Sequence, residues 1–267
     1  MEDIKSLLKK NRPAVSDSTI KTYSSIVSNL YKKVSGSTNL DNAIEFFEKH
    51  SKDVMAFLKD VPSSSRKTTL ASLVVLCEKK PCADIYRKQM LDDAVKYNDS
   101  EKDQEKTETQ KENWVSQDEL KNIYDALDKD TRPLLSKSVL KDPELQRLQN
   151  FVILSLYVLQ PPRRLQDYTE MKIHGDINKE EDNYINKTKF VFNKYKTAKH
   201  HGKEEVAINP KLKFILNKWV KLNPHDYMLV SINHSKLSSS QLQQRLNGIL
   251  GRKASVNILR HSFLSDK

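Results

Sequence analysis

The sequence predicts a mainly α-helical protein with a small antiparallel β-sheet in its second half. Only five of the 267 residues are glycine, and Leu, Lys, Asp and Glu are frequent, a composition typical of helical proteins. Apolar residues recur at helical spacing along most of the chain, whereas residues 184–195 alternate apolar and polar side chains as a strand does. A polar segment separates the two parts. We therefore expect a helical bundle followed by an α+β domain.

The first domain, residues 1–97, is expected to be a bundle of four amphipathic helices with short connections. Residues 16–18 (Ser-Asp-Ser) are good N-cap types for the first helix, and Ser35-Gly36 ends it. The helices are expected from about Ser16 to Val34, from Leu40 to Leu58 with a candidate break at His50-Ser51, after Pro62 through Leu76, and from Ala83 to Tyr97.

Residues 98–113 contain no apolar side chain. A stretch of this length cannot offset its ordering entropy by burial, so we interpret it as an acidic, polar linker between domains. The second domain is then residues 114–267. It holds 26 Lys and Arg against 17 Asp and Glu, within a net charge of +11 for the chain. Such a basic excess commonly meets a polyanion, and a solvated basic surface without a partner is the alternative.

The second domain is expected to surround one buried helix. Residues 144–160 form this helix, which is apolar on all sides from Phe151 to Leu159 and ends at Pro161-Pro162. Ser116 and Glu119 form a capping box for a helix before it. The remaining elements are expected as strands at 184–195, 206–208 and 227–230, with a turn at 200–202, and as helices at 211–222, 238–250 and 256–266.

Several classes of protein are excluded or disfavoured. No run of 18 apolar residues predicts a membrane span, and residues 1–5 lack the apolar region of a signal peptide, so we expect an intracellular protein that does not enter a membrane. Cys77 and Cys82 have no second pair with which to bind zinc. The glycines form no phosphate-cradling motif. We expect neither a metal nor another cofactor.

Two arginines follow the apolar helix directly. Arg163 and Arg164 would be held at the domain surface, where a fixed guanidinium suits bidentate binding of a phosphodiester. Asp167 lies one helical turn past Arg164 and can orient it. The alternative is a helix-end arginine that only pairs with a carboxylate.

Two further basic sites follow. Residues 194–199 (Lys-Tyr-Lys-Thr-Ala-Lys) occupy the tip of the expected hairpin, where a lysine can reach a groove or protonate a leaving oxygen, although a solvated basic hairpin is the alternative. Arg260 lies among apolar Val256, Leu259 and Phe263. It should be partly buried, and a buried arginine needs an anionic partner.

The order of these sites resembles the tyrosine recombinase (phage-type integrase) family. Arg164-x-x-Asp167 is similar to that family's first arginine box, Lys196-Thr197 to its hairpin lysine, and residues 257–261 (Asn-Ile-Leu-Arg-His) to its second arginine box. The resemblance implies a SAM-like helical core-binding domain and an α+β catalytic domain that close as a clamp around duplex DNA. The boxes look similar to those of large DNA viruses and their mobile elements.

The resemblance also implies a reaction and its residues. In this family a tyrosine attacks the phosphate and forms a 3′-phosphotyrosyl bond without a metal or nucleotide cofactor, during site-specific DNA recombination or integration. Arg164 and Arg260 would stabilise the phosphate oxygens, Lys196, with Lys199 as the competing candidate, would protonate the leaving 5′ oxygen, and Asp167 would give support from behind. Multimers on DNA are implied as well.

Two departures from the family pattern limit the expectation of catalysis. Asn257 replaces a histidine used in proton transfer, and an amide cannot act as a general base at neutral pH, although it can orient a phosphate oxygen. The nucleophilic tyrosine should follow Arg260, but the last tyrosine is Tyr227. We therefore expect this chain alone to be inactive in cleavage, and a non-catalytic DNA-binding remnant is the alternative function.

Further DNA contacts are expected in both domains. Arg163 and Lys199 flank the expected catalytic residues. In the first domain Ser64, Arg66 and Lys67 open a helix after Pro62 and are candidates for contact with the DNA backbone, although a solvated helix start explains them equally well.

Overall fold

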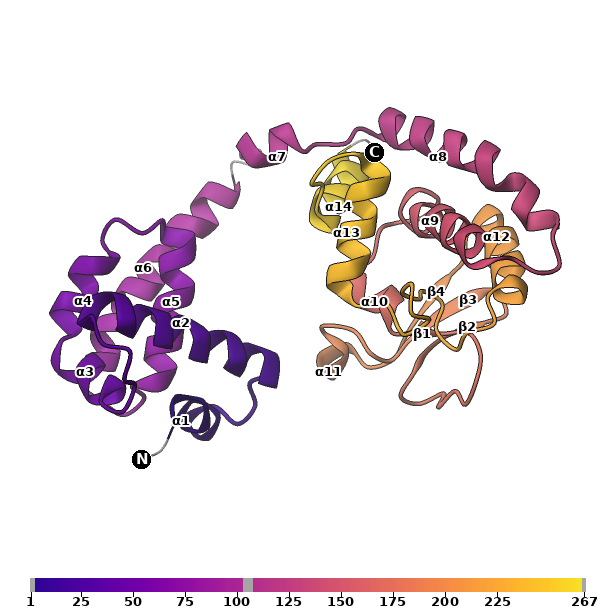
Figure 1. Cartoon of the computed structure of the whole chain (residues 1–267). Helices are drawn as coiled ribbons and strands as arrows, with labels where there is room; N and C mark the ends of the chain where they lie inside the picture. The colour runs from indigo at the N-terminus through magenta and orange to yellow at the C-terminus, as the bar shows by residue number, and fades with distance from the viewer. Residues whose placement is uncertain (1–2, 103–107, 266–267) are drawn as a thin grey trace. The chain divides into compact units, whose positions relative to one another are not determined.

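The computed structural model describes residues 3–102 and 108–265. The expected mainly helical fold with a small sheet is confirmed (Figure 1). The chain divides into two compact units, residues 1–105 and 106–267, each with its own hydrophobic core. The division falls inside the polar segment 98–113. The described residues include no helix long and apolar enough to cross a membrane.

Unit 1 is a helical bundle built around one apolar cluster. The Ser16 side chain accepts a hydrogen bond from the Thr19 amide and caps the long second helix, which ends at Gly36 with φ of 73°, a conformation that favours glycine. The expected break at His50-Ser51 is present, and an additional helix precedes Ser16. Its helices are α1 (Ile4–Asn11), α2 (Asp17–Ser35), α3 (Ala43–Lys49), α4 (Ser51–Leu58), α5 (Ser63–Leu76) and α6 (Cys82–Lys102).

The polar segment is more helical than its composition suggested. Residues 98–102 continue α6, and residues 108–112 form the short helix α7 (Glu108–Glu112). Glu, Gln and Lys favour helices even where nothing is buried, which explains helix formation without apolar side chains. The part of the expected linker at 103–107 lies outside the described residues.

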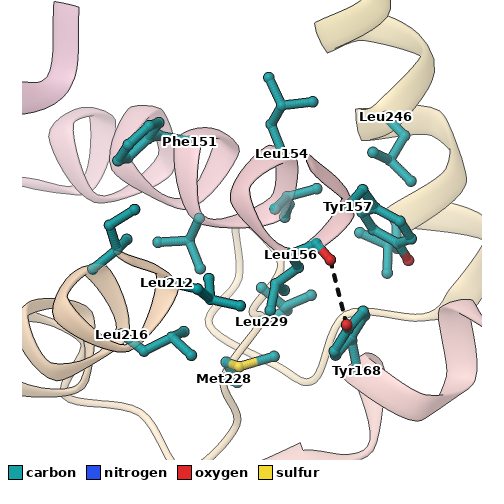
Figure 2. Packing of buried hydrophobic residues seen from close by; sticks show 14 of the residues in the cluster. Phe151, Leu154, Leu156, Tyr157, Tyr168, Leu212, Leu216, Met228, Leu229 and Leu246 are labelled. Carbon is teal, nitrogen blue, oxygen red and sulfur yellow. Dashed lines mark hydrogen bonds between the residues drawn. The ribbon is translucent and has the colours of Figure 1, made fainter. Parts of the chain in front are cut away.

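Unit 2 is built around α9 (Asp142–Val158), the buried helix that the sequence predicted, and several of its other helices pack against it. Leu154, Leu156 and Tyr157 of α9 are buried against Leu212 of α12 and Leu246 of α13 (Figure 2). The other described helices of this unit are α8 (Gln117–Thr131), the 3-10 helix η1 (Arg132–Ser136), α10 (Leu165–Thr169), α11 (Ala198–His201), α12 (Pro210–Leu222), α13 (Ser239–Leu250) and α14 (Val256–Ser265).

The sheet of unit 2 has four strands in the order β1-β2-β3-β4. They are β1 (Met171–Lys172), β2 (Asn183–Asn186), β3 (Lys189–Phe192) and β4 (Glu204–Ala207). β2, β3 and β4 are antiparallel, but β1 is parallel to β2, so the sheet is mixed. The single strand expected at 184–195 is a hairpin, because the chain turns at Lys187 with φ of 51°. In the segment 227–230, only Tyr227 and Val230 form isolated bridges, and no strand forms there.

Candidate functional site

The ten arginines of the chain fall into two classes, those that form an ion pair with a carboxylate and those that form none in the described residues. Seven form an ion pair with a carboxylate: Arg12, Arg66, Arg87, Arg132, Arg147, Arg163 and Arg252. Arg164, Arg245 and Arg260 form none with any carboxylate in the described residues. Unpaired guanidinium groups are free to bind an external anion, so these three are candidates for ligand contact.

Arg164 and Arg260 line the same surface pocket of about 390 Å³, although they lie far apart in the sequence. Arg164 is the N-cap residue of α10, two residues after the prolines that follow α9. Arg260 lies on α14 and is partly buried, as the apolar residues around it predicted. The tertiary structure therefore brings the two arginine boxes together and leaves both guanidinium groups without a carboxylate among the described residues.

Arg163 has a structural role that differs from the expected DNA contact. Its Nε donates to Oδ2 of Asp167 at 2.9 Å, and its two terminal nitrogens donate to the carboxylate oxygens of Glu204 at 2.8 Å each. Its guanidinium carbon lies 4.0 Å from the ring centroid of Phe192. Burial lowers the pKa of Arg163, but Glu204 and Asp167 outweigh it and raise the net pKa. Its donors are occupied, so a phosphate would have to displace a buried ion pair.

Asp167 pairs with Arg163, whereas we expected it to orient Arg164. The residue is 1% exposed, and its Oδ1, which has no hydrogen-bond partner in the described structure, belongs to a residue that lines the pocket. Burial raises the pKa of Asp167, and Arg163 opposes the shift only in part. Asp167 is therefore a buried carboxylate of the pocket lining that holds Arg163.

The lysine candidates lie in the connection between β3 and β4. Tyr195 and Thr197 both line the pocket, and Lys196 lies between them with an exposed side chain. Lys199 is exposed on α11. The Tyr195 hydroxyl donates to the carbonyl of Gly202 at 2.8 Å, so this tyrosine braces the connection. Both residues adjacent to Lys196 in the sequence line the pocket, which is not so for Lys199. Both lysines stay candidates.

Asn183 joins the lysine connection to the first arginine box. The residue is fully buried, and its Nδ2 donates to the carbonyls of Asp167 at 3.1 Å and Lys194 at 2.8 Å. Its Oδ1 accepts from the amides of Asn193 at 2.8 Å and Lys194 at 2.6 Å. One amide side chain therefore fixes the chain just before Lys196 relative to the turn of α10 that follows Arg164.

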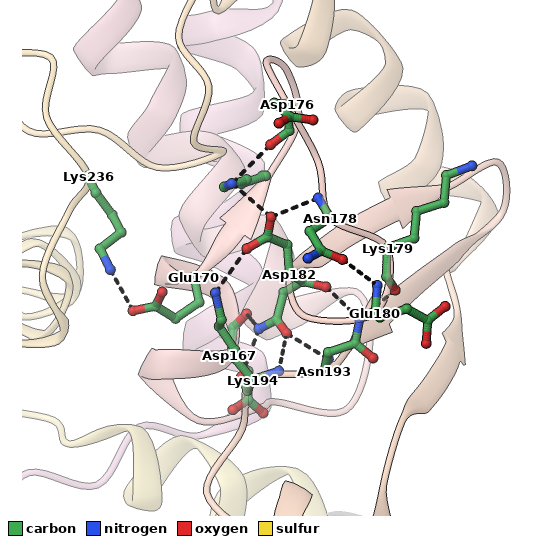
Figure 3. A network of polar contacts seen from close by, with 12 residues as sticks. Asp167, Glu170, Asp176, Asn178, Lys179, Glu180, Asp182, Asn193, Lys194 and Lys236 are labelled. Atoms are coloured by element: carbon green, nitrogen blue, oxygen red, sulfur yellow. Dashed lines mark hydrogen bonds and ion pairs between the residues drawn. The ribbon is translucent and has the colours of Figure 1, made fainter.

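Asp182 strengthens this arrangement from the neighbouring position (Figure 3). Its carboxylate accepts from Lys172 at 2.7 Å, Lys194 at 2.9 Å and the amide of Asn178 at 3.0 Å. Burial raises its pKa, but the hydrogen bonds from the two lysines and the amide prevail and lower the pKa to about 2. Lys194 is therefore held by Asp182, and the next lysine along the connection is Lys196.

The remaining expected residue of the second arginine box lies outside the pocket lining. Asn257 is exposed on α14, one turn before Arg260. His261, the last residue of that box, is exposed as well. Neither residue lines the Arg164–Arg260 pocket among the described residues.

In unit 1 the three expected DNA contacts differ from one another. Arg66 is an internal residue: it binds both carboxylate oxygens of the buried Asp93 at 2.6 and 2.7 Å and the carbonyl of Lys59 at 2.8 Å. This pairing lowers the pKa of Asp93. Ser64 is exposed in the first turn of α5, and Lys67 places its ammonium 3.9 Å from the ring centroid of Tyr97. Ser64 and Lys67 stay candidates, whereas Arg66 fixes α5 to α6.

The sequence did not single out Glu204 and Asn183, which shape the site, or Arg245, which lies outside the Arg164–Arg260 pocket. Glu204 and Asn183 carry no local motif, because their partners lie in other elements of the fold. Arg245 had one signal: Leu242 and Leu246, which flank it on an amphipathic helix, are buried, and such a position predicts partial burial of the arginine between them.

Comparison with solved structures gives weak similarities, among them one to a recombinase. No protein-family model and no curated protein matches the chain. A crystal structure titled as XerA recombinase aligns with 98% of this chain and 82% of its own, with a TM-score of 0.40 and 13% sequence identity.

Proposed function

We propose that this protein binds duplex DNA and acts in site-specific DNA recombination or integration by the chemistry of a tyrosine recombinase. The observation that carries the proposal is the pair Arg164 and Arg260, which line one pocket with no carboxylate partner in the described residues. Two guanidinium groups at one pocket are an arrangement that stabilises the growing charge on the nonbridging oxygens of a phosphodiester. The basic excess of residues 114–267 supports the same ligand.

In the proposed reaction, each residue of this chain has one task. Arg164 and Arg260 bind the nonbridging oxygens of the scissile phosphate. Lys196, from the β3–β4 connection, protonates the 5′ oxygen as it leaves, while a tyrosine hydroxyl attacks phosphorus to give the 3′-phosphotyrosyl bond. Arg163 and Asp167 hold the pocket in shape. The attacking tyrosine is one that would follow Arg260.

Binding is tested with residues 1–267 and a duplex oligonucleotide at several salt concentrations. A protein that contacts phosphates shows a linear fall of log K with log salt concentration. Arg164→Ala and Arg260→Ala should each lower the slope by about 1. The control Arg147→Ala removes an exposed arginine paired with Asp130 and should have less effect. Absence of binding, or a salt-independent affinity, would refute the proposal.

Cleavage separates the recombinase from its alternative, a non-catalytic DNA-binding protein. A chain with a tyrosine after Arg260 is incubated with a nicked duplex that traps the covalent intermediate. Arg164→Ala should abolish covalent trapping and leave much of the binding, because it removes an interaction made most strongly in the transition state. Equal trapping by the variant would overturn the role of Arg164. No trapping by the parent chain, with binding retained, would favour the non-catalytic protein.

A further inference from the structure

Arg245 is the third arginine without a carboxylate partner in the described residues, and it lies outside the Arg164–Arg260 pocket. It is partly buried on α13 and donates only to neutral amide oxygens, those of Gln146 and, at 3.4 Å, Asn150. Burial lowers its pKa, and no neighbouring anion opposes this shift. A partly buried guanidinium usually has an anionic partner, because desolvation without one is costly.

The surroundings of Arg245 form a second surface pocket, of about 520 Å³. Its polar wall comes from the loop 231–235 and from Gln241 and Gln244 of α13, and no Asp or Glu of the described residues lines it. The Oε1 of Gln241 already accepts from the amide and the hydroxyl of Ser238, which leaves its Nε2 as a donor. The Nε2 of Gln146, beside the guanidinium, is buried without a partner. The pocket wall and the amide beside the guanidinium therefore carry unused hydrogen-bond donors.

We propose that this pocket binds a phosphate-class oxyanion, with Arg245 supplying the charge and the side-chain amides of Gln241, Gln244 and Asn233 the neutral donors. An anion satisfies the uncompensated guanidinium and the unused amide hydrogens together. A cation finds no carboxylate on this wall. The same chemistry has two sources, a phosphodiester of DNA and free phosphate.

The Arg245 pocket is separate from the Arg164–Arg260 pocket. The two share no lining residue. Arg245 contacts Gln146 and Asn150 in the first half of α9, whereas the Arg164–Arg260 pocket begins at Pro161, past the end of that helix. From Asn150 to Val158, where α9 ends, the helical rise amounts to roughly 12 Å. Binding at Arg245 therefore does not depend on the proposed recombinase function.

Free phosphate is tested by NMR titration of the chain, with chloride at matched ionic strength as the reference. Phosphate should cause saturable shifts of the side-chain amides of Asn233, Gln241 and Gln244. Arg245→Gln should weaken the titration about tenfold or more, while Arg147→Gln, which removes the same charge from an exposed site, should not. No saturable shift in the parent chain, or equal titration by the two variants, would overturn the proposal.

Two more variants keep the result interpretable. Arg245→Lys retains the charge and should keep binding within a few-fold, so it decides the matter if Arg245→Gln fails to fold. An Arg164→Ala, Arg260→Ala double variant should retain the phosphate titration even where it loses duplex binding. Loss of the Asn233, Gln241 and Gln244 shifts in that double variant would show that the phosphate had bound at the other pocket, against the proposal.

Duplex binding then identifies the source of the anion. If a DNA phosphate occupies the pocket, Arg245→Gln should lower the slope of log K against log salt concentration by about 1 relative to Arg147→Gln. If the two variants share one slope while only Arg245→Gln loses the phosphate titration, free phosphate is the ligand. Either result supports an oxyanion site at Arg245.

Discussion

Arg163 donates from Nε to Oδ2 of Asp167 at 2.9 Å, while its neighbour Arg164 has no carboxylate partner in the described residues. Two adjacent arginines therefore differ in role, since one forms a buried ion pair and the other forms none. Arg163 also binds Glu204 of β4 and ties α10 to the sheet. Arg164 is left free at the mouth of a pocket that Arg260 shares.

Substitution of Arg163 and substitution of Arg164 should have different effects on the stability of unit 2. Arg163→Ala leaves the buried Asp167 unpaired and should cost about 3–5 kcal/mol in the free energy of unfolding of unit 2, whereas Arg164→Ala should cost less than about 1 kcal/mol. Urea unfolding followed by tryptophan fluorescence measures this, because Trp114 and Trp219, the two tryptophans of the chain, both belong to unit 2. Equal losses in the two variants would contradict the assignment of roles.

In a chain with a tyrosine after Arg260, substitution of Lys196 and substitution of Lys199 should have different effects on the rate of DNA cleavage. Lys196→Ala should slow cleavage by about 10²-fold or more, since it removes the proposed general acid, and Lys199→Ala should change the rate little. A substrate with sulfur at the 5′ bridging position should restore the Lys196→Ala rate, because a thiolate leaves without protonation. Restoration of Lys199→Ala instead would reverse the assignment.

Asn183 should keep the β3–β4 connection, residues 193–202, in its folded conformation. Asn183→Ala removes four hydrogen bonds to the backbone of Asp167, Asn193 and Lys194 and leaves those backbone groups unpaired, at about 1–3 kcal/mol for each buried group. Hydrogen exchange of residues 193–202 should accelerate while exchange in α9 stays unchanged. Asn186→Ala, at the exposed end of β2, is the control. Unchanged exchange at 193–202 would show that the connection is held by other contacts.

Asp182 should make unit 2 sensitive to acid. Its pKa is about 2 in the folded protein against an ordinary value of 3.8, so its contribution is present above pH 4 and is lost as the pH falls toward 2. The difference in unfolding free energy between the parent and Asp182→Asn should shrink by about 2 kcal/mol from pH 5 to pH 2. Tryptophan fluorescence in urea at each pH measures it. A pH-independent difference would show that Lys172 and Lys194 do not stabilise the ionised carboxylate.

Local sequence patterns predicted elements whose cause is local. The capping serines, the apolar stripe of α2 and the fully apolar stretch of α9 identified helices, because capping and amphipathic burial depend on residues three and four positions apart. The turn at Lys187 was missed, since alternation of side chains continues through a tight hairpin and hides the break. The extension of α6 was missed because helix propensity operates without apolar residues.

The site divides in the same way. The sequence by itself determined which basic residues stand near apolar ones, and hence that Arg164 and Arg260 were candidates for a rigid anion site. Only the tertiary structure decided which guanidinium forms an ion pair. Glu204 binds Arg163 from a strand forty-one residues away, and Asp93 binds Arg66. No carboxylate of the described residues forms an ion pair with Arg164, Arg245 or Arg260. Ion pairing depends on distance in space, and the order of residues along a chain does not contain that distance until the chain has folded.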